Sequence, residues 1–265
     1  MNHLENLVID GEPQSIGSFS FENCHMLKEI DIPSSIININ DYAFSNCSNL
    51  QSISFSNRIE HIGYAVFNGC SSLNHLSLPS AIKGKSPIGS LFGIEPYENS
   101  FPINQMISSE ISHTYYLPYS LKKVELTKGF ITDGMFSNLV GMDIIIKNYQ
   151  GNIGAFSFFQ CDSIREMIVE SSTRVLGDYA FYGCRNLTSF KSNNNTHTFG
   201  KYVLANCLSL KNIYLGGIKN FNKEIIEDTD GLVSLTFSDK SPYKIHESFV
   251  RSEERRVGKE CRFRW

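Results

Sequence analysis

Apolar residues recur with a fixed period along most of the chain. The segments INDYAFSNCSNLQSISF (39–55) and LGDYAFYGCRNLTSFKS (176–192) share one frame, I-G-x-x-A-F-x-x-C-x-x-L-x-x-I-x-I. Further copies align without gaps at 16–33, 62–79, 153–169 and 199–215, and neighbouring copies in each run begin 23 residues apart. Because a unit of this length cannot bury its own apolar face, we expect the units to stack into a solenoid with one continuous core.

The end of the frame, L-x-x-I-x-I, alternates between apolar and polar residues, which predicts a short strand with one buried face. Weaker copies at 4–10, 136–146 and 221–237 and an interrupted unit at 86–126 extend the pattern. The sequence therefore predicts a β-rich leucine-rich-repeat solenoid over residues 1–250, with a curved parallel β-sheet of about ten strands and uncapped ends. The strands are centred on the pairs Leu7/Ile9, Ile30/Ile32, Ile53/Phe55, Leu76/Leu78, Val124/Leu126, Ile144/Ile146, Met167/Val169, Phe190/Ser192, Ile213/Leu215 and Leu235/Phe237.

Stacking places like residues of successive repeats one above another, roughly 4.8 Å apart, so the frame predicts three apolar ladders. The glycines that follow the first apolar residue, among them Gly63, Gly177 and Gly200, suit a turn in which the backbone needs conformational freedom. The ladders are the set Ile16, Ile39, Ile62, Ile153, Leu176 and Phe199, the set Phe21, Phe44, Phe67, Phe181 and Leu204 with Phe158 near it, and the set Leu27, Leu50, Leu73, Ile164, Leu187 and Leu210.

One frame position is cysteine in the six clearest repeats, which predicts a structural ladder of buried, reduced thiols. A structural zinc site needs ligands in short pairs such as C-x-x-C, and the sequence has no such pair. Stacked side chains that point the same way into the core also do not suit the geometry of a disulfide. The six residues are Cys24, Cys47, Cys70, Cys161, Cys184 and Cys207.

Charge and motifs argue against several function classes. The net charge is −3, and residues 251–265 hold six basic and three acidic side chains, which leaves −6 for the rest and no basic face for nucleic acid. No apolar run reaches the roughly 18–20 residues of a membrane helix. The histidines are scattered, and no nucleophile elbow, phosphate-binding loop or dinucleotide fingerprint occurs. We expect no catalytic residues, cofactor, metal, nucleic-acid partner or membrane insertion, and so no enzyme.

The frame, its cysteine and its period resemble the leucine-rich repeats of the BspA type, which occur in surface proteins of gut and oral bacteria and of some parasitic protists. The resemblance covers about residues 1–250, and the segment 86–126 is similar to an interrupted unit of gut Firmicutes relatives. It implies an exported protein, secreted or at the cell surface, whose partner is a host or matrix protein.

Both ends of the chain break the repeat. Leu4 aligns with Leu27, so Met1 falls in the middle of a unit, and the pattern vanishes at Arg251. Residues 251–265 (RSEERRVGKECRFRW) resemble a translated sequencing adapter, except at Phe263, where serine is expected. We expect an interior piece of a longer solenoid followed by a non-native basic tail, and the alternative is a genuine basic tail.

The residues that alternate with the buried strand positions point outward and form the first candidate binding surface. Most are small or polar, but Ile145 and Ile168 break this pattern and Tyr214 lies two strands further on. An exposed apolar patch flanked by polar groups is typical of a contact surface. The alternative is a shifted register that buries the two isoleucines.

The second candidate is an insert at 93–118 inside the interrupted repeat. The frame positions of the first apolar residue and the leucine are 33 residues apart here and 11 apart in regular repeats, so about 22 residues are inserted. The insert carries Tyr97, Tyr115 and Tyr116, and tyrosine is favoured at recognition surfaces. The alternative is that these rings pack on the solenoid and fill the interruption.

Two function classes follow from these features. The first is a non-catalytic protein-binding or adhesion module of a cell-surface or secreted protein. The second is a structural spacer that displays a catalytic or glycan-binding domain outside this sequence, and carbohydrate binding by the aromatic insert is a third option.

Overall fold

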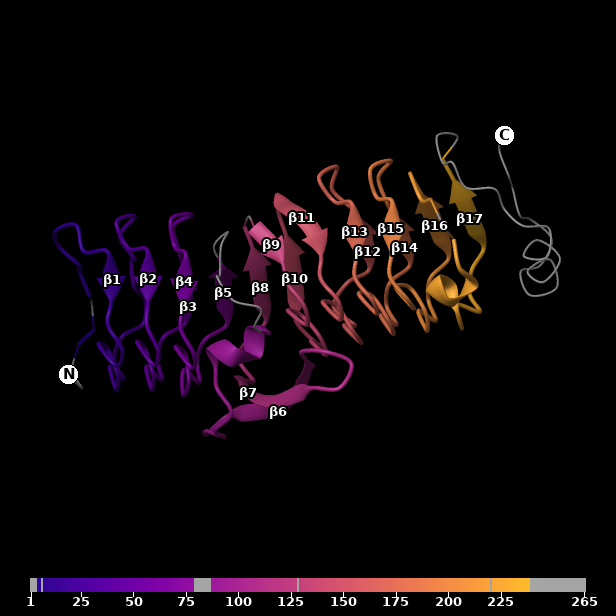
Figure 1. Cartoon of the computed structure of the whole chain (residues 1–265). Coiled ribbons are helices and arrows are strands. Elements are labelled where there is room, and N and C mark those ends of the chain that lie inside the picture. Colours follow the sequence, from indigo (N-terminus) through magenta and orange to yellow (C-terminus); the bar gives the residue numbers. More distant parts are fainter. Residues whose placement is uncertain (1–3, 6, 79–86, 128, 220, 239–265) are drawn as a thin grey trace. The chain divides into compact units, whose positions relative to one another are not determined.

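The computed structural model of this chain describes residues 4–5, 7–78, 87–127, 129–219 and 221–238. Short strands make up almost all of its regular structure, together with two 3-10 helices, η1 (Ile88–Leu91) and η2 (Lys223–Ile226). Strands of successive repeats pair in parallel (Figure 1). This arrangement confirms the predicted β-solenoid. Residues 251–265, for which the sequence predicts a separate tail, lie outside the described residues.

The chain forms two compact units, Met1–Phe130 with Gly141–Tyr149 and Ile131–Val140 with Gln150–Trp265. Each unit contains a four-stranded parallel sheet built from the L-x-x-I-x-I segments, which we call the first and second sheets. The first sheet has the order β10 (Asp143–Ile146), β8 (Lys123–Leu126), β5 (His75–Leu78) and β3 (Ser52–Ser54). The second has the order β12 (Glu166–Ile168), β14 (Ser189–Lys191), β16 (Asn212–Leu215) and β17 (Ser234–Phe237).

Eight of the ten predicted strand segments therefore form strands. In the second sheet the buried residues Met167, Phe190, Ile213 and Leu235 lie side by side, which is the predicted register. The segment around Ile30/Ile32 makes only a single bridge, from Asp31 to Ser54. The segment around Leu7/Ile9 is not a strand, although its side chains alternate between half-buried and exposed as expected.

A second set of parallel pairings involves the start of each repeat. It comprises the three-stranded sheet β1 (Ser15–Ile16), β2 (Asn38–Ile39) and β4 (His61–Ile62), and a four-stranded sheet in the order β15 (Thr198–Phe199), β13 (Val175–Leu176), β11 (Tyr149–Ile153) and β9 (Gly129–Ile131). The apolar pattern of the sequence does not predict these strands, because five of the seven have only two residues, too few to show alternation.

The turn between the two strands of a repeat is also bonded to the next repeat. Two residues of the turn at 39–55 are left-handed, Tyr42 (φ 56°) and Asn46 (φ 58°). The amides of Phe44 and Asn46 donate to carbonyls one repeat further on, at 3.1 and 2.7 Å. The rings of Phe44 and Phe67 stack 6.3 Å apart in the core beneath. Turns and strands are thus bound to their neighbours by the same kind of ladder.

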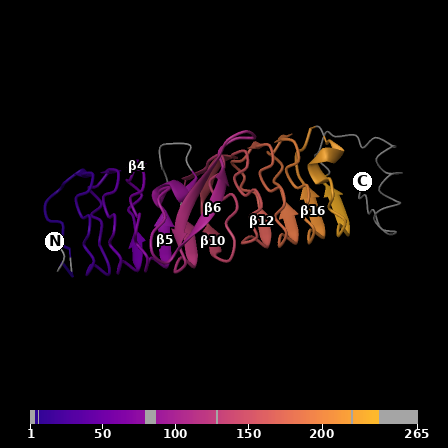
Figure 2. The ribbon, with the colours of Figure 1, turned by 90° about the horizontal axis from the view of Figure 1, so that it is seen from below.

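The insert forms an antiparallel hairpin of β6 (Ser100–Met106) and β7 (Ser112–Pro118). Figures 1 and 2 show it beside the turns of the first unit, outside the stacked strands. Phe92 and Leu121, on either side of it, are buried and continue the phenylalanine and leucine ladders, with the Phe92 ring 6.1 Å from that of Phe67. The hairpin therefore leaves the core uninterrupted.

The glycines after the first apolar residue serve close packing, and the prediction that they provide backbone freedom is wrong. Gly63, Gly177 and Gly200 do not have positive φ, which falls instead two residues further on, at Tyr179 in the repeat of Gly177. A Cβ added to Gly177 would lie 2.4 Å from the backbone nitrogen of Ala155 in the preceding turn. The repeats approach so closely here that only glycine fits.

Substitution of Gly177 should therefore destabilise the stack. We expect Gly177→Ala to lower the free energy of unfolding by about 2 kcal/mol, because backbone atoms must move apart. Gly17 holds the same frame position, but its added Cβ would meet only the Ser20 hydroxyl, at 3.0 Å. Gly17→Ala should change stability by less than about 0.5 kcal/mol. Urea unfolding followed by circular dichroism measures both, and equal losses would contradict the packing explanation.

Candidate functional site

The outward positions of the second sheet form two rows that cross its four strands. One row holds Glu166, Ser189, Asn212 and Ser234. The other holds Ile168, Lys191, Tyr214 and Thr236, and we call it the Lys191 row. These are the outward positions that the alternation predicts.

The Lys191 row combines an exposed apolar side chain with a cation and an aromatic ring. Ile168 is 69% exposed, so the alternative of a shifted, burying register does not apply to it. The Nζ atom of Lys191 lies 5.5 Å from the centroid of the half-buried Tyr214 ring, within the range of a cation–π contact. The two partner-binding candidates Ile168 and Tyr214 therefore lie in one row, with Lys191 between them.

Ile145 lies on the outward face of the first sheet. Its side chain is half-buried, and it sits on the edge strand β10 opposite Glu125 of β8. Ile145 and Ile168 belong to different compact units, so each is considered with its own sheet.

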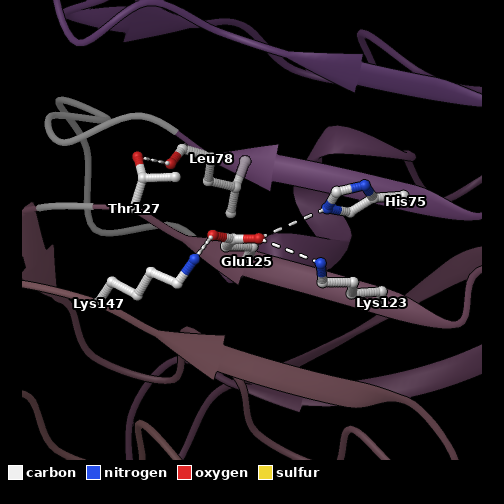
Figure 3. Close-up of polar contacts among 6 residues, drawn as sticks. All are labelled: His75, Leu78, Lys123, Glu125, Thr127 and Lys147. Atoms are coloured by element: carbon white, nitrogen blue, oxygen red, sulfur yellow. Dashed lines mark hydrogen bonds and ion pairs between the residues drawn. The ribbon is translucent and has the colours of Figure 1, made fainter.

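Glu125 is an acidic side chain buried on the face of the first sheet among three basic ones (Figure 3). Its carboxylate oxygens lie 2.7 Å from Lys147 Nζ, 3.3 Å from Lys123 Nζ and 3.8 Å from His75 Nε2. The hydrogen bond from Lys147 is the main cause that lowers the pKa of Glu125. Burial, followed by the charge of Lys123, lowers the pKa of His75. The ionised carboxylate thus ties together β5, β8 and the end of β10.

Loss of the Glu125 charge should cost stability in a pH-dependent way. Because folding lowers this pKa, the ion pairs stabilise the fold above the ordinary value of 4.5, and the stabilisation is lost as the pH falls through the lowered value. Glu125→Gln should reduce the free energy of unfolding by about 1 kcal/mol at neutral pH. Urea unfolding across the acid range should show the difference from the wild type vanishing.

The matched control is Glu166→Gln in the second sheet, since Glu166 is exposed and makes no ion pair within the described part of the chain. It should leave stability unchanged at every pH. A deficit of Glu125→Gln that persisted in acid would exclude an electrostatic origin.

The six in-register cysteines lie in the core, and all are free thiols. Each thiol with a cysteine-bearing repeat before it donates to a phenylalanine carbonyl of that repeat: Cys47 Sγ lies 3.2 Å from the oxygen of Phe21, and Cys184 Sγ lies 3.0 Å from that of Phe158. The same carbonyl of Phe158 accepts the amide of Cys161 at 3.1 Å. Cysteine thus supplies a small donor that satisfies the second lone pair of a buried carbonyl.

Burial disfavours the thiolate form of four of these cysteines. It raises the pKa of Cys47 and of Cys161 to about 12, and it raises the pKa of Cys70 and of Cys184 well above the ordinary 9.0. A thiol must lose its proton to act as a nucleophile or a metal ligand. Burial and these pKa shifts favour a structural role for the ladder.

Thiol labelling can test this assignment. In a Cys261→Ser variant, which removes the cysteine outside the frame, a disulfide reagent at about pH 8 should label none of the six thiols in the folded protein and all six in urea. The six thiols are buried in the folded protein, where the reagent cannot reach them, and urea exposes them by unfolding the chain. Fast labelling of any one of them before unfolding would show that it is accessible.

The structure distributes the three insert tyrosines over different environments. Tyr115 is 4% exposed and lies against Gly89, whereas the next residue, Tyr116, is half-buried on the opposite face of the hairpin, beside Pro102. Tyr97 is half-buried, and burial raises its pKa strongly. Tyr115 is thus buried and offers almost no surface to a partner.

A family model for the BspA type leucine rich repeat region matches six copies in this chain, over residues 1–87 and 129–253. The matched ranges cover most of the chain. The chain belongs to the BspA-type leucine-rich-repeat family. This confirms the resemblance that the frame, the cysteine and the period indicate. Proteins of this family are typically non-catalytic.

The BspA-type chain also resembles solved structures of bacterial leucine-rich-repeat proteins. One from Bacteroides ovatus ATCC 8483 is 16% identical, covering 95% of this chain and 75% of that one, with a TM-score of 0.42. The T. pallidum leucine rich repeat protein is 20% identical over 76% and 74%, with a TM-score of 0.35. The pneumococcal vaccine antigen PcpA is 15% identical over 90% and 76%, with a TM-score of 0.33. No curated protein matches.

Within the described ranges, no group of three His, Cys, Asp or Glu side chains could hold a metal ion. None of the described helices is long and apolar enough to cross a membrane.

Sequence reasoning missed two features of the BspA-type repeats. The sequence pattern does not single out Lys191 from the other polar outward residues, because its lack of a carboxylate partner among the described residues depends on strand pairing. The pattern as analysed also omits a row of turn rings: Phe156, Tyr179 and Tyr202 stack at 5.1 Å intervals at a left-handed position. Their 23-residue spacing was a signal that could have revealed them.

Proposed function

We propose that this chain is a protein-binding module of an adhesion protein at the cell surface. Leucine-rich-repeat proteins generally bind other proteins, and solenoids do so through the extended faces of their stacked repeats. Membership of the BspA-type family, in which surface proteins are common, supports the cell-surface location. A host or matrix protein is the proposed partner.

The observation that carries the proposal is the composition of the Lys191 row. A solvated sheet face needs only small and polar side chains, yet Ile168 leaves 69% of its surface in water beside Lys191 and Tyr214. Burial of such a side chain by a partner is favourable, and aromatic residues are enriched in protein interfaces. In the first unit, Ile145, Tyr97 and Tyr116 are further candidates, but each is already half-buried.

Ile168→Asp should weaken binding through this face. The whole chain would be immobilised on a biosensor and tested against a panel of purified extracellular-matrix and serum proteins. We expect saturable binding of at least one of them, weakened about tenfold or more by Ile168→Asp, because a buried unpaired carboxylate is costly. Ile145→Asp, measured separately, tests the first sheet.

The matched control is Leu208→Asp, which places the same charge on an apolar residue that is 51% exposed in a turn of the same unit. It should bind as the wild type does. Affinity that survives Ile168→Asp in a folded protein would disprove the assignment of this face. Absence of any binding would favour the alternative, a spacer that displays another domain.

A further inference from the structure

The outward lysine side chains of the two sheets have different contact partners. On the first sheet Lys123 and Lys147 both contact the carboxylate of Glu125, at 3.3 and 2.7 Å. Lys191 holds an outward position of the second sheet, and within the described ranges it makes no ion pair. Its contact is with the face of the Tyr214 ring. The first sheet thus pairs its lysines with its own carboxylate, whereas the second presents a lysine that has no carboxylate partner among the described residues.

The surroundings of Lys191 supply no other charge in its own row. Ile168 on one side, Tyr214 on the other and Thr236 beyond are all uncharged. The carboxylate on the outward positions of this sheet is Glu166, which lies in the other row opposite Ser189. The immediate site is therefore a single cation between two apolar groups.

We propose that the Lys191 row binds an acidic segment of a partner protein. This inference rests on the proposed function and specifies the chemistry of its partner. A carboxylate of the segment pairs with Lys191, and apolar side chains next to that carboxylate cover Ile168 and Tyr214. Neighbouring strands lie roughly 4.8 Å apart, so a few residues of the partner span all three positions.

The chemistry of the row favours a protein over a polyanion. Nucleic acids and sulfated polysaccharides are bound by several cations at once, because they carry an anionic group on each repeating unit. This row offers one cation, and its neighbours are an exposed isoleucine and a tyrosine. A polypeptide supplies a carboxylate and apolar groups side by side.

Selection from random peptides displayed on phage tests the proposal with a defined probe. Peptides enriched on the whole chain should carry Asp or Glu beside leucine, isoleucine or an aromatic residue. A synthetic copy of an enriched peptide should bind Lys191→Glu at least about tenfold more weakly than the wild type. Lys201→Glu is the matched control, because it makes the same charge change at an exposed turn residue of the same unit and should leave the affinity unaltered.

The outcomes separate this inference from the proposed function. Peptides that lose binding with Ile168→Asp but lack acidic residues, or bind Lys191→Glu as before, would overturn the acidic partner and leave the protein-binding face in place. If no peptide is enriched, or if neither Ile168→Asp nor Lys191→Glu changes the binding, the result would count against the acidic partner and against the proposed protein-binding face.

Two other occupants of the row can be tested with the same variants. Heparin binding that disappears in Lys191→Glu would assign the row to a sulfated polysaccharide. Sedimentation that shows dimers of the wild type and monomers of Lys191→Glu would assign it to a second copy of the chain. Either result would overturn the proposed acidic partner protein.

Discussion

Hydrogen bonds between successive repeats are the interaction on which the structure depends. Strands of two to four residues have no stability alone, and they persist because the amides and carbonyls of one repeat bond to those of the next. Side chains extend the same ladder: the Asp178 carboxylate accepts the amide of Lys201 at 2.8 Å, and Cys207 donates to the carbonyl of Phe181 at 3.1 Å. Such a ladder requires repeats of equal length and close approach, which accounts for both the fixed period and the glycine at the tightest contact.

The same constraint explains how the chain accepts a hairpin inside one repeat. The insertion occurs between the phenylalanine and leucine positions, so the ladder is satisfied on both sides of it by Phe92 and Leu121. The hairpin is then anchored locally, because the buried Gln105 side chain accepts the amide of Gly89 at 2.7 Å. Extra loop length itself costs little free energy, and the loss of a ladder rung would cost more.

The sequence predicts those parts of the fold that are specified by a periodic pattern of apolar side chains. Ile213 and Leu215 alternate with outward residues and recur every 23 positions, so strand, register and core follow from the chain alone. The two-residue strands and the left-handed turn rings are set by backbone hydrogen bonds between repeats. Such bonds produce no alternation of apolar and polar residues in the sequence. The opposite environments of Tyr115 and Tyr116 depend on the hairpin register, and the isolation of Lys191 depends on which strands pair.

Stacking fixes every inward residue, so a partner that binds a sheet face meets about two outward residues in each strand. On the first sheet those positions are largely used by the protein itself: an incoming carboxylate would be repelled by Glu125 and would compete with it for Lys123 and Lys147. On the second sheet an incoming carboxylate meets Lys191 without breaking an ion pair, and it displaces water from Ile168 and Tyr214 as it binds. The expected cost of binding an acidic segment is therefore lower on the second sheet, although both sheets are built from the same frame, and this difference favours the Lys191 row as its proposed site.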